Sequence, residues 1–367
     1  MDSRVQKLAQ VLVAYSLDLQ PGETLAVKTN PLADELNLAV YQEALLAGAH
    51  VTFLNQIPGM WEVYYRYAGL AELDHVSEFE RIVHEQFSAI LDIEAEYNTR
   101  ELTEVDPARI TRRRSARRDL FRTMLERMAN GDLKWCGTLF PTPASAQEAN
   151  MGLIDYQEFV YKAGMLDSPD PVMAWKEKDA KQKSIIDLLM AKESLVLRGK
   201  DIDLRLSIKG RVFNSAAGRT NFPDGEIFTS PVEESASGWI RFAYPAIYSS
   251  REVDNVELWF QDGKIVKEKA TKGEEFLREV LNTDPGARYL GELGIGTNYA
   301  IQRFTKNMLF DEKLGGTIHL AVGIGFPELG SQNHSAIHWD LLCDMADGEI
   351  LADGETIYQN GKFILGS

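Results

Sequence analysis

The side chains best suited to chemistry gather toward the C-terminal end of the chain. Three of the six histidines, His319, His334 and His338, lie within twenty positions of one another. Imidazole is a neutral metal ligand and also titrates near neutral pH, so such clustering is typical of a metal or catalytic site. His338 and Asp340 are two positions apart, and on a β-strand both would project from one face. This spacing predicts a pair that can bind one metal ion.

Each of these residues also has a simpler interpretation. Without a metal, His338 and Asp340 could form a hydrogen-bonded pair at the edge of a strand. His319 lies in the apolar string TIHLAV, where a core histidine needs only one buried partner. His334 follows the polar residues SQN and is expected at most to line a site. The histidines alone therefore leave a metal site and ordinary core packing both open.

Two glutamates stand out among the 55 acidic residues because of their neighbours. Glu226 lies in NFPDGEIFTSP and Glu292 in ARYLGE, each beside glycine and apolar residues. A carboxylate buried in such a setting needs a cation or an ion-pair partner, whereas one in a turn needs only water. The glycines of GELGIG do not fit the GxGxxG spacing and follow no clear strand, so we do not expect dinucleotide binding.

The elements that must position these residues begin with an α/β pattern. Short apolar strands alternate with helical periodicity, and the alternation predicts a mostly parallel sheet with flanking helices. Such sheets commonly bind ligands beyond the carboxyl ends of their strands. The expected strands cover residues 24–28, 51–54, 89–93 and 134–139, and the expected helices cover 32–47 and 107–129.

The pattern becomes β-rich after a proline-containing connection, MLDSPDPVMAW, and a helix over 176–192. Alternating residues predict strands at 194–197, 203–208 and 256–260, and QDGK at 261–264 is typical of a hairpin turn. We therefore expect two domains. Residues 1–170 would form the N-terminal α/β domain with its mostly parallel sheet, and residues 171–367 a β-rich α+β C-terminal domain that binds metal.

The balance of acidic and basic residues limits the classes of molecule that the chain is expected to bind. The chain has 55 acidic and 39 basic residues and a formal net charge of −16. Because this charge repels polyphosphate and anionic lipid, we expect no nucleic-acid partner and no membrane partner. One basic run, RRRSARR at 112–118, departs from this background. We interpret it as the solvated face of a helix whose buried stripe is formed by Leu120, Phe121, Met124 and Leu125.

Targeting and redox signals are weak. The first residues lack the apolar core of a signal peptide, and no stretch approaches the ~18 apolar residues of a membrane span. Cytoplasmic localisation is the resulting expectation. Cys136 and Cys343 show no CxxC pattern, so they predict neither a disulfide framework nor a cysteine zinc site. Both are expected to be buried thiols.

Four strings carry a resemblance to a known family. NFPDGEIFTSP, ARYLGE, FDEKLGGTIHLAVG and NHSAIHWDLL resemble, in order and approximate spacing, motifs of the M29 family of metalloaminopeptidases. The resemblance covers the C-terminal part of the chain, and the N-terminal half agrees in layout only. It implies a homodimer that removes N-terminal residues from peptides with a free N-terminus and holds two divalent metal ions, such as zinc, cobalt or manganese. The implied ligands are Glu226, Glu292, His319, His338 and Asp340.

The resemblance also implies roles within that set. Water activated between two divalent ions would hydrolyse the peptide bond. Glu292 is expected to bridge the ions, and Glu226 to be a further ligand or a general base, so these two are the predicted catalytic residues. Phe326 stands where the family has a tyrosine thought to act at the site. Either the transition state is stabilised by other means here, or the activity is weak or altered.

Two other functions compete with peptide hydrolysis. Proteins related to this group include non-haem Fe(II) dioxygenases that open dihydroxypyridine-like rings, and His319, His338 and Asp340 alone would satisfy a two-histidine, one-carboxylate iron site. A binding protein that kept the fold and lost the chemistry is the third option. In the N-terminal half the histidines lie at no motif spacing, so we expect no chemistry from them. They are His50, His75 and His84.

Overall fold

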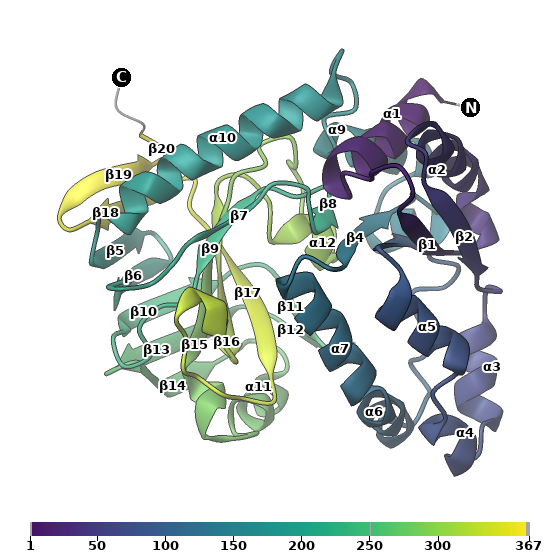
Figure 1. The fold of residues 1–367 in the computed structure, drawn as a ribbon. Helices are drawn as coiled ribbons and strands as arrows, with labels where there is room; N and C mark the ends of the chain where they lie inside the picture. The colour runs from purple at the N-terminus through teal and green to yellow at the C-terminus, as the bar shows by residue number, and fades with distance from the viewer. Residues whose placement is uncertain (1, 250, 365–367) are drawn as a thin grey trace. The chain divides into compact units, whose positions relative to one another are not determined.

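The computed structural model describes residues 2–249 and 251–364. The chain separates into two compact units, each with its own sheets. The first comprises Met1–Ala174 and Gly218–Pro223, and the second Trp175–Ala217 and Asp224–Ser367. The units are described separately below and can be followed by colour in Figure 1.

A five-stranded parallel sheet forms the centre of the first unit. Its order is β2-β1-β3-β4-β8. The short last strand returns from far along the chain to pair with β4. The strands are β1 (Thr24–Thr29), β2 (His50–Asn55), β3 (Ala89–Glu94), β4 (Lys134–Leu139) and β8 (Asn221–Phe222). Buried runs such as Leu25, Ala26 and Val27 have the apolar character expected of a sheet covered on both faces.

Helices connect and flank these strands (Figure 1). They are α1 (Ser3–Val11), which continues as a π-helix over Leu12–Ser16, the 3₁₀ turn Pro31–Ala33, α2 (Asp34–Leu46), α3 (Met60–Tyr67), α4 (Leu70–Asp74), α5 (Glu78–Gln86), α6 (Pro107–Ala116), α7 (Arg118–Ala129), α8 (Pro143–Glu148) and α9 (Leu153–Ala163). The single helix expected over 107–129 is wrong, because the α-helical hydrogen bonding is interrupted at Arg117. The expected stripe is also only half right: Leu120 and Met124 are buried, but Phe121 and Leu125 are exposed.

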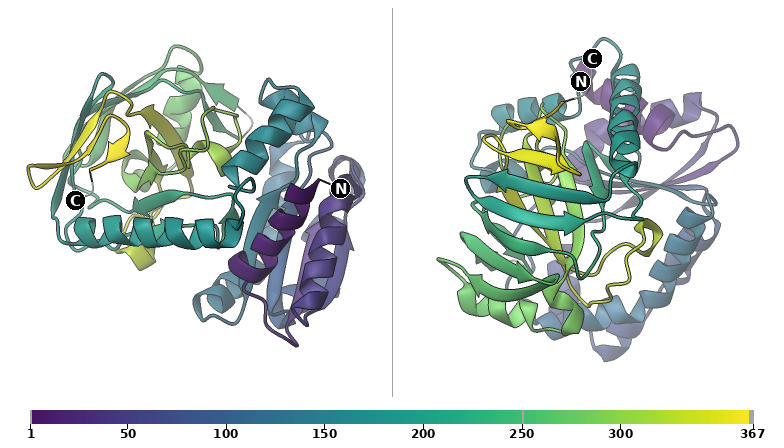
Figure 2. Two further views of the ribbon diagram at one scale, coloured as in Figure 1. Left: turned by 90° about the horizontal axis from the view of Figure 1, so that it is seen from above. Right: turned by 90° about the vertical axis from the view of Figure 1, so that its left-hand side faces the viewer.

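Two main antiparallel sheets build the second unit, and both can be followed in Figure 2. The larger has eight strands in the order β14-β13-β10-β6-β5-β18-β19-β20. They are β5 (Ser194–Gly199), β6 (Ile202–Ser207), β10 (Ser237–Phe242), β13 (Val256–Gln261), β14 (Lys264–Lys269), β18 (Glu349–Ala352), β19 (Glu355–Gln359) and β20 (Lys362–Phe363). The smaller sheet has five strands in the order β17-β16-β15-β9-β7. These strands are β7 (Asn214–Ala216), β9 (Glu226–Thr229), β15 (Leu290–Gly296), β16 (Thr317–Gly323) and β17 (His338–Asp344).

One hydrophobic core joins the two sheets of the second unit. Leu204, Ile240 and Leu258 from the larger sheet share it with Leu293 and Leu320 from the smaller one. The remaining elements are α10 (Pro171–Met190), the hairpin of β11 (Ala246–Tyr248) and β12 (Arg251–Val253), α11 (Glu274–Leu281), α12 (Met308–Asp311) and the 3₁₀ turns Pro285–Arg288 and Pro327–Leu329. The smaller sheet therefore has one face in the core, and its other face is available for polar residues.

The expected fold class, a mostly parallel α/β region followed by a β-rich region, is confirmed. The turn predicted at 261–264 joins β13 to β14, with Asp262 and Gly263 both at positive φ as such hairpins require. The expected domain limits, 1–170 and 171–367, stay a prediction, and they did not anticipate the return of Gly218–Pro223 to the first unit. Among the described residues, no helix is both long and apolar enough to cross a membrane.

Candidate metal centre

Four neighbouring strands of the smaller sheet carry the five residues expected to bind metal. Glu226 begins β9, Glu292 lies in β15, His319 in β16, and His338 and Asp340 at the start of β17. The spacing of His338 and Asp340 thus does reflect a strand, as expected. Because these strands are hydrogen-bonded in the order β17-β16-β15-β9, residues distant in sequence become neighbours in space.

The strand register places all five side chains on one face of the sheet. Ala321 pairs with Glu292 on one side and with Asp340 on the other. Directly paired residues share a face, and so do residues two apart along a strand. His319 and His338 therefore join them, and Glu226 follows because it pairs with Gly296 of β15. The intervening residues of β15 and β16 point into the core, as their complete burial shows: Leu293, Ile295, Ile318 and Leu320.

An irregularity in β15 determines which way Glu292 points. Leu290 pairs with Val322, but Glu292 pairs with Ala321, so Gly291 is an extra residue in the ladder. In an unbroken register Glu292 would lie opposite Leu320, on the core side. The bulge therefore turns a carboxylate from the hydrophobic core to the opposite face.

Gly294 makes room for the imidazole of His319. The two residues are paired across β15 and β16. A Cβ atom at Gly294 would lie 2.0 Å from Cε1 of His319 and 2.2 Å from its Nε2, far inside van der Waals contact. The ring of His319 therefore lies across the backbone of β15, which lets it reach the space between the two glutamates. This requirement, and not a dinucleotide, accounts for a glycine in the GELGIG string.

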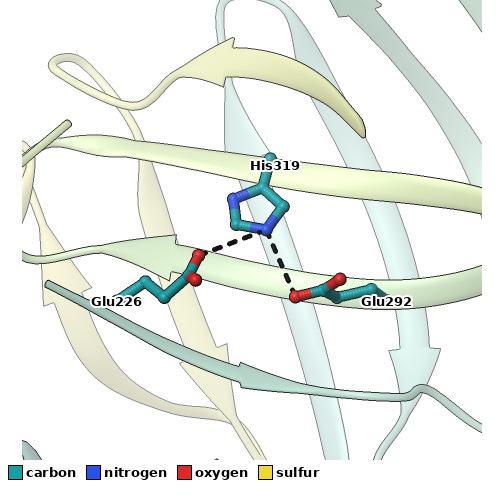
Figure 3. A group of neighbouring side chains, drawn as sticks. All are labelled: Glu226, Glu292 and His319. Atoms are coloured by element: carbon teal, nitrogen blue, oxygen red, sulfur yellow. Dashed lines mark hydrogen bonds and ion pairs between the residues drawn. The ribbon is translucent and has the colours of Figure 1, made fainter. Parts of the chain in front are cut away.

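The first group of side chains is formed by Glu226, Glu292 and His319 (Figure 3). Nε2 of His319 lies 3.4 Å from Oε2 of Glu226 and 3.4 Å from Oε1 of Glu292. All three residues are buried, with exposed fractions of 6%, 5% and 1% in the same order. Each offers one ligand atom within 4.8 Å of the others, which is compact enough for a single cation.

The second group is formed by Glu292, His338 and Asp340 and shares Glu292 with the first. Nε2 of His338 lies 3.2 Å from Oε2 of Glu292 and 3.5 Å from Oδ1 of Asp340. Nδ1 of the same ring donates a hydrogen bond to the carbonyl oxygen of Ile324, at 2.9 Å. That bond fixes the ring and leaves Nε2 directed at the carboxylates. His338 and Asp340 are half-buried, so this end of the cluster is the more open one.

Burial and mutual attraction perturb the ionisation of the cluster. Burial raises the pKa of Glu226 to about 7. Burial acts in the same direction on Glu292, but hydrogen bonds from His319 and His338 outweigh it and lower the pKa of that carboxyl to about 2. Burial opposes protonation of His338, yet Asp340 and Glu292 raise its pKa to about 11. Glu292 and the imidazole of His338 thus stabilise each other's charged forms, whereas burial favours the neutral form of Glu226. A bound cation would displace protons from the cluster.

Lys313 is a charged neighbour that the sequence analysis missed. Its side chain is fully buried, and its Nζ lies 3.1 Å from Oε1 of Glu226. It belongs to the FDEKLGG string, but a lysine among acidic residues is normally a solvated surface residue, so its type and spacing gave no signal.

Phe326 and His334, which the sequence analysis also considered, have different surroundings. The ring of Phe326 packs edge-on against the ring of His338, with 5.6 Å between the centroids, so the residue in the place of the family's tyrosine does lie beside the cluster. His334 is exposed in the loop before β17. Within the described residues, neither metal-binding group includes His50, His75 or His84.

A sheet face that carries three carboxylates and two imidazoles has the ligand set of a metalloprotein, and comparison with known proteins identifies the family. The model of the thermophilic metalloprotease (M29) family matches residues 1–363. The chain therefore belongs to the M29 family, and the resemblance inferred from four C-terminal strings extends over both units. The expected class of enzyme, a metalloaminopeptidase, is confirmed with it.

Individual relatives agree with this assignment. Aminopeptidase 2 of Geobacillus stearothermophilus is 29% identical, over 99% of this chain and 98% of the relative. Aminopeptidase AmpS of Bacillus subtilis (strain 168) is 26% identical, over 99% and 100%. The solved structure of wild-type AmpT from Thermus thermophilus has the same fold, with a TM-score of 0.85 and 22% identity over 99% of both chains.

Proposed function

We propose that this chain removes N-terminal residues from peptides with a cluster that holds two divalent cations. Glu226, Glu292 and His319 would hold one cation, and Glu292, His338 and Asp340 the other. The observation that carries the proposal is the position of Glu292. Its two oxygens face two different imidazoles, at 3.4 Å and 3.2 Å, as expected of a carboxylate shared by two ions.

The donor atoms fit divalent cations. Oε2 of Glu226 and Oδ1 of Asp340 are buried and make no hydrogen bond to any described residue, which is costly for an oxygen without a cation. A set of three carboxylates and two imidazoles suits zinc, cobalt or manganese.

The protein's own residues would prepare the reaction. When bound, two divalent cations supply Lewis acidity and lower the pKa of water, so that a nucleophile is available at neutral pH. Glu292 keeps the two halves of the cluster at a fixed separation. The carbonyl of Ile324 holds the proton on Nδ1 of His338 and so keeps Nε2 free as a ligand atom. Glu292 and Glu226 are the residues we assign to catalysis.

Charge would select the substrate. Two bound divalent cations would neutralise the three carboxylates of the cluster, so attraction for a cationic substrate would come from the rest of the chain, whose formal net charge is −16. A free α-ammonium group is attracted to such an acidic protein, whereas a blocked N-terminus is not. The half-buried residues His338 and Asp340, with Phe326 beside them, mark the end of the cluster that a substrate could approach. A preference of this kind for a free N-terminus would make the enzyme an exopeptidase.

No comparison supports the alternative of a ring-opening dioxygenase. Such a mononuclear iron site requires open positions on the metal, and two additional buried glutamates next to His319 would tend to fill them. The homodimer and the cytoplasmic location expected from the sequence remain predictions, which sedimentation and cell fractionation can test.

The decisive experiment combines metal analysis with an activity assay. We expect close to two divalent ions per chain and hydrolysis of unblocked dipeptides or aminoacyl reporters, with N-acetylated versions of the same compounds left intact. A single bound iron, together with oxygen consumption on an aromatic diol, would instead establish the dioxygenase. Cleavage of acetylated and free peptides at equal rates would contradict the exopeptidase proposal.

A further inference from the structure

Lys313 is fully buried among acidic side chains next to the metal centre. Its Nζ lies 3.1 Å from Oε1 of Glu226 and 4.0 Å from Oδ1 of Asp224, and it also pairs closely with Glu312. Burying an ammonium group is costly unless carboxylates surround it. Since its side chain has no exposed surface, Lys313 cannot meet a substrate directly. Any contribution to the site must pass through another residue.

The backbone holds Lys313 in place. Its amide donates a hydrogen bond to the carbonyl of Phe310, and its carbonyl accepts one from the amide of Asn298, at 3.1 Å and 3.0 Å. The following residue, Leu314, lies directly over Gly296, where a Cβ would be 2.0 Å from the Leu314 carbonyl oxygen. Gly296 is the residue that pairs with Glu226. The loop that carries Lys313 is therefore fixed against the strands that carry the glutamates.

The two oxygens of Glu226 face different partners. Oε1 is the oxygen near Lys313, whereas Oε2 lies 3.4 Å from Nε2 of His319 and makes no hydrogen bond to the described residues. A carboxylate free at both oxygens could bind a cation through both, or swing away to accept a proton. With Oε1 held by Lys313, only Oε2 is directed into the group formed with Glu292 and His319.

We propose that Lys313 is a positioning residue that holds Oε1 of Glu226, so that Glu226 binds a cation through Oε2 alone and does not act as a free general base. The inference rests on the proposed metal-dependent function and names a residue that sets the geometry of one of its two cation sites. Lys313 thus affects the Glu226–Glu292–His319 group and leaves the Glu292–His338–Asp340 group unaffected.

The test measures metal binding directly in the full chain. Protein freed of metal with EDTA is titrated with Co²⁺ and followed by calorimetry and by visible absorption, which reports the ligands of each ion. Loss of a group that orients a ligand typically weakens metal binding about 10–100-fold. In Lys313→Met we expect a loss of this size at one of the two sites and an unchanged dissociation constant at the other. Lys183→Met is the matched control, because Lys183 is an exposed lysine that also pairs with a carboxylate.

The outcomes separate the two proposals. If Lys313→Met binds two ions with the same two dissociation constants as the wild type, the positioning role is overturned. The proposed function would still stand. Absence of Co²⁺ binding in the wild type overturns both. A lysine that only stabilised the fold would lower the melting temperature of the metal-free protein without changing the Co²⁺ spectrum, and that result also contradicts the proposal.

A second variant covers the case in which Lys313→Met does not fold. Lys313→Gln keeps a group that can donate a hydrogen bond to Oε1 of Glu226 but removes the charge. We expect its affinity at the same site to fall by less than that of Lys313→Met, with the second site again unchanged. Wild-type affinity at both sites in a folded Lys313→Gln protein would be evidence against the positioning role.

Discussion

Two charged regions of the molecule behave in opposite ways. In the first unit, most arginines of the run at 112–118 lie near the surface: Arg112 of α6 pairs with Asp74 at 2.5 Å, and Arg117, between α6 and α7, pairs with Glu80 at 2.9 Å. Arg113 departs from the expected solvated face, because it is buried and pairs with Glu80 at 3.2 Å. In the second unit, two carboxylates of the proposed metal centre, Glu226 and Glu292, are buried and that of Asp340 is half-buried. Two of the oxygens in this group make no hydrogen bond within the described chain.

The difference shows that conspicuous charge in a sequence is a poor guide to function. Exposed pairs lose little solvation and are worth little, with a median near 0–1 kcal/mol. Buried carboxylates without hydrogen bonds are costly, so a fold that retains several of them on one sheet face implies a ligand that compensates the cost. The arginine run is the most obvious charged motif of the chain, yet the proposed metal site is formed by acidic residues that are scattered along the sequence of the second unit.

The largest expected effect comes from Glu292→Gln, which keeps the size of the shared ligand and removes its charge. Loss of a group that only orients a ligand costs about 10–100-fold, so loss of the shared ligand should lower kcat/KM by more than about 100-fold. Metal content should fall in parallel. The matched control is Glu275→Gln, an exposed glutamate of α11, which should keep full activity. Retention of both ions and of turnover in Glu292→Gln would remove the basis of the comparison.

Removal of bound metal by a chelator should lower the thermal stability of the protein. A ligand that binds the folded state alone stabilises it by RT ln(1 + [L]/Kd), about 2.7 kcal/mol at a hundredfold excess over Kd. We therefore expect the melting temperature to drop when EDTA removes the metal and to recover when Zn²⁺ or Co²⁺ is added back. An unchanged melting curve in protein shown to have lost its metal would mean that the buried carboxylates are compensated in some other way.

Gly294→Ala should disrupt the cluster without changing any charged residue. The added methyl group would lie 2.0 Å from the His319 ring, and overpacking of this kind costs about 1–3 kcal/mol. We expect lower thermal stability together with loss of metal, measured by melting and by elemental analysis. Gly152→Ala serves as control, since the nearest neighbour of its new Cβ would be at 3.6 Å. Normal metal content in Gly294→Ala would contradict the role assigned to the glycine.

Phe326→Tyr should increase the activity of the proposed site by adding a hydroxyl group beside His338. The ring already packs against that imidazole, and the family resemblance places a tyrosine there. We expect kcat to rise on the order of tenfold, equivalent to about 1.4 kcal/mol of barrier, with little change in metal content. A steady-state comparison of both proteins on one aminoacyl reporter checks this. Equal or lower kcat in the variant would show that the site works without that hydroxyl.

The smallest effect is expected in the arginine region. Arg112→Ala removes an exposed ion pair with Asp74 and should leave the free energy of unfolding nearly unchanged, with kcat/KM also unchanged. Denaturant unfolding and the same reporter assay give both values. A large loss of activity would show that the basic helices contribute to function after all, which would undo the comparison.

The sequence predicted most of the strands and named the five residues that the structure brings together, but it did not predict the features that orient their side chains. The HxD spacing requires only a strand, and β17 supplies it. The bulge at Gly291 and the pairing of Gly294 with His319 depend on which strands become neighbours, and local periodicity carries no such information. The sequence did not predict the buried Lys313 for the same reason, because burial of a lysine depends on its surroundings in three dimensions.

The sequence also predicted some boundaries of secondary-structure elements better than others. The helix predicted over 107–129 breaks at Arg117, where no glycine or proline signals an end. The edge strand β8 has only two residues, too short for any period to be recognised, and yet it completes the parallel sheet of the first unit. Local propensity was sufficient for the long elements and insufficient for short ones that depend on tertiary pairing.

The return of Gly218–Pro223 to the first unit has a practical consequence for protein engineering. The polypeptide passes from one unit to the other after Ala174, after Ala217 and after Pro223. A single cut near residue 174 would leave the N-terminal fragment without strand β8 and the C-terminal fragment with an unmatched β8 segment. Separate expression would therefore require one gene fusion for each unit and not simple truncation. Ala174 would be joined to Gly218 in the first unit, and Ala217 to Asp224 in the second, for example by a short linker that replaces Gly218–Pro223.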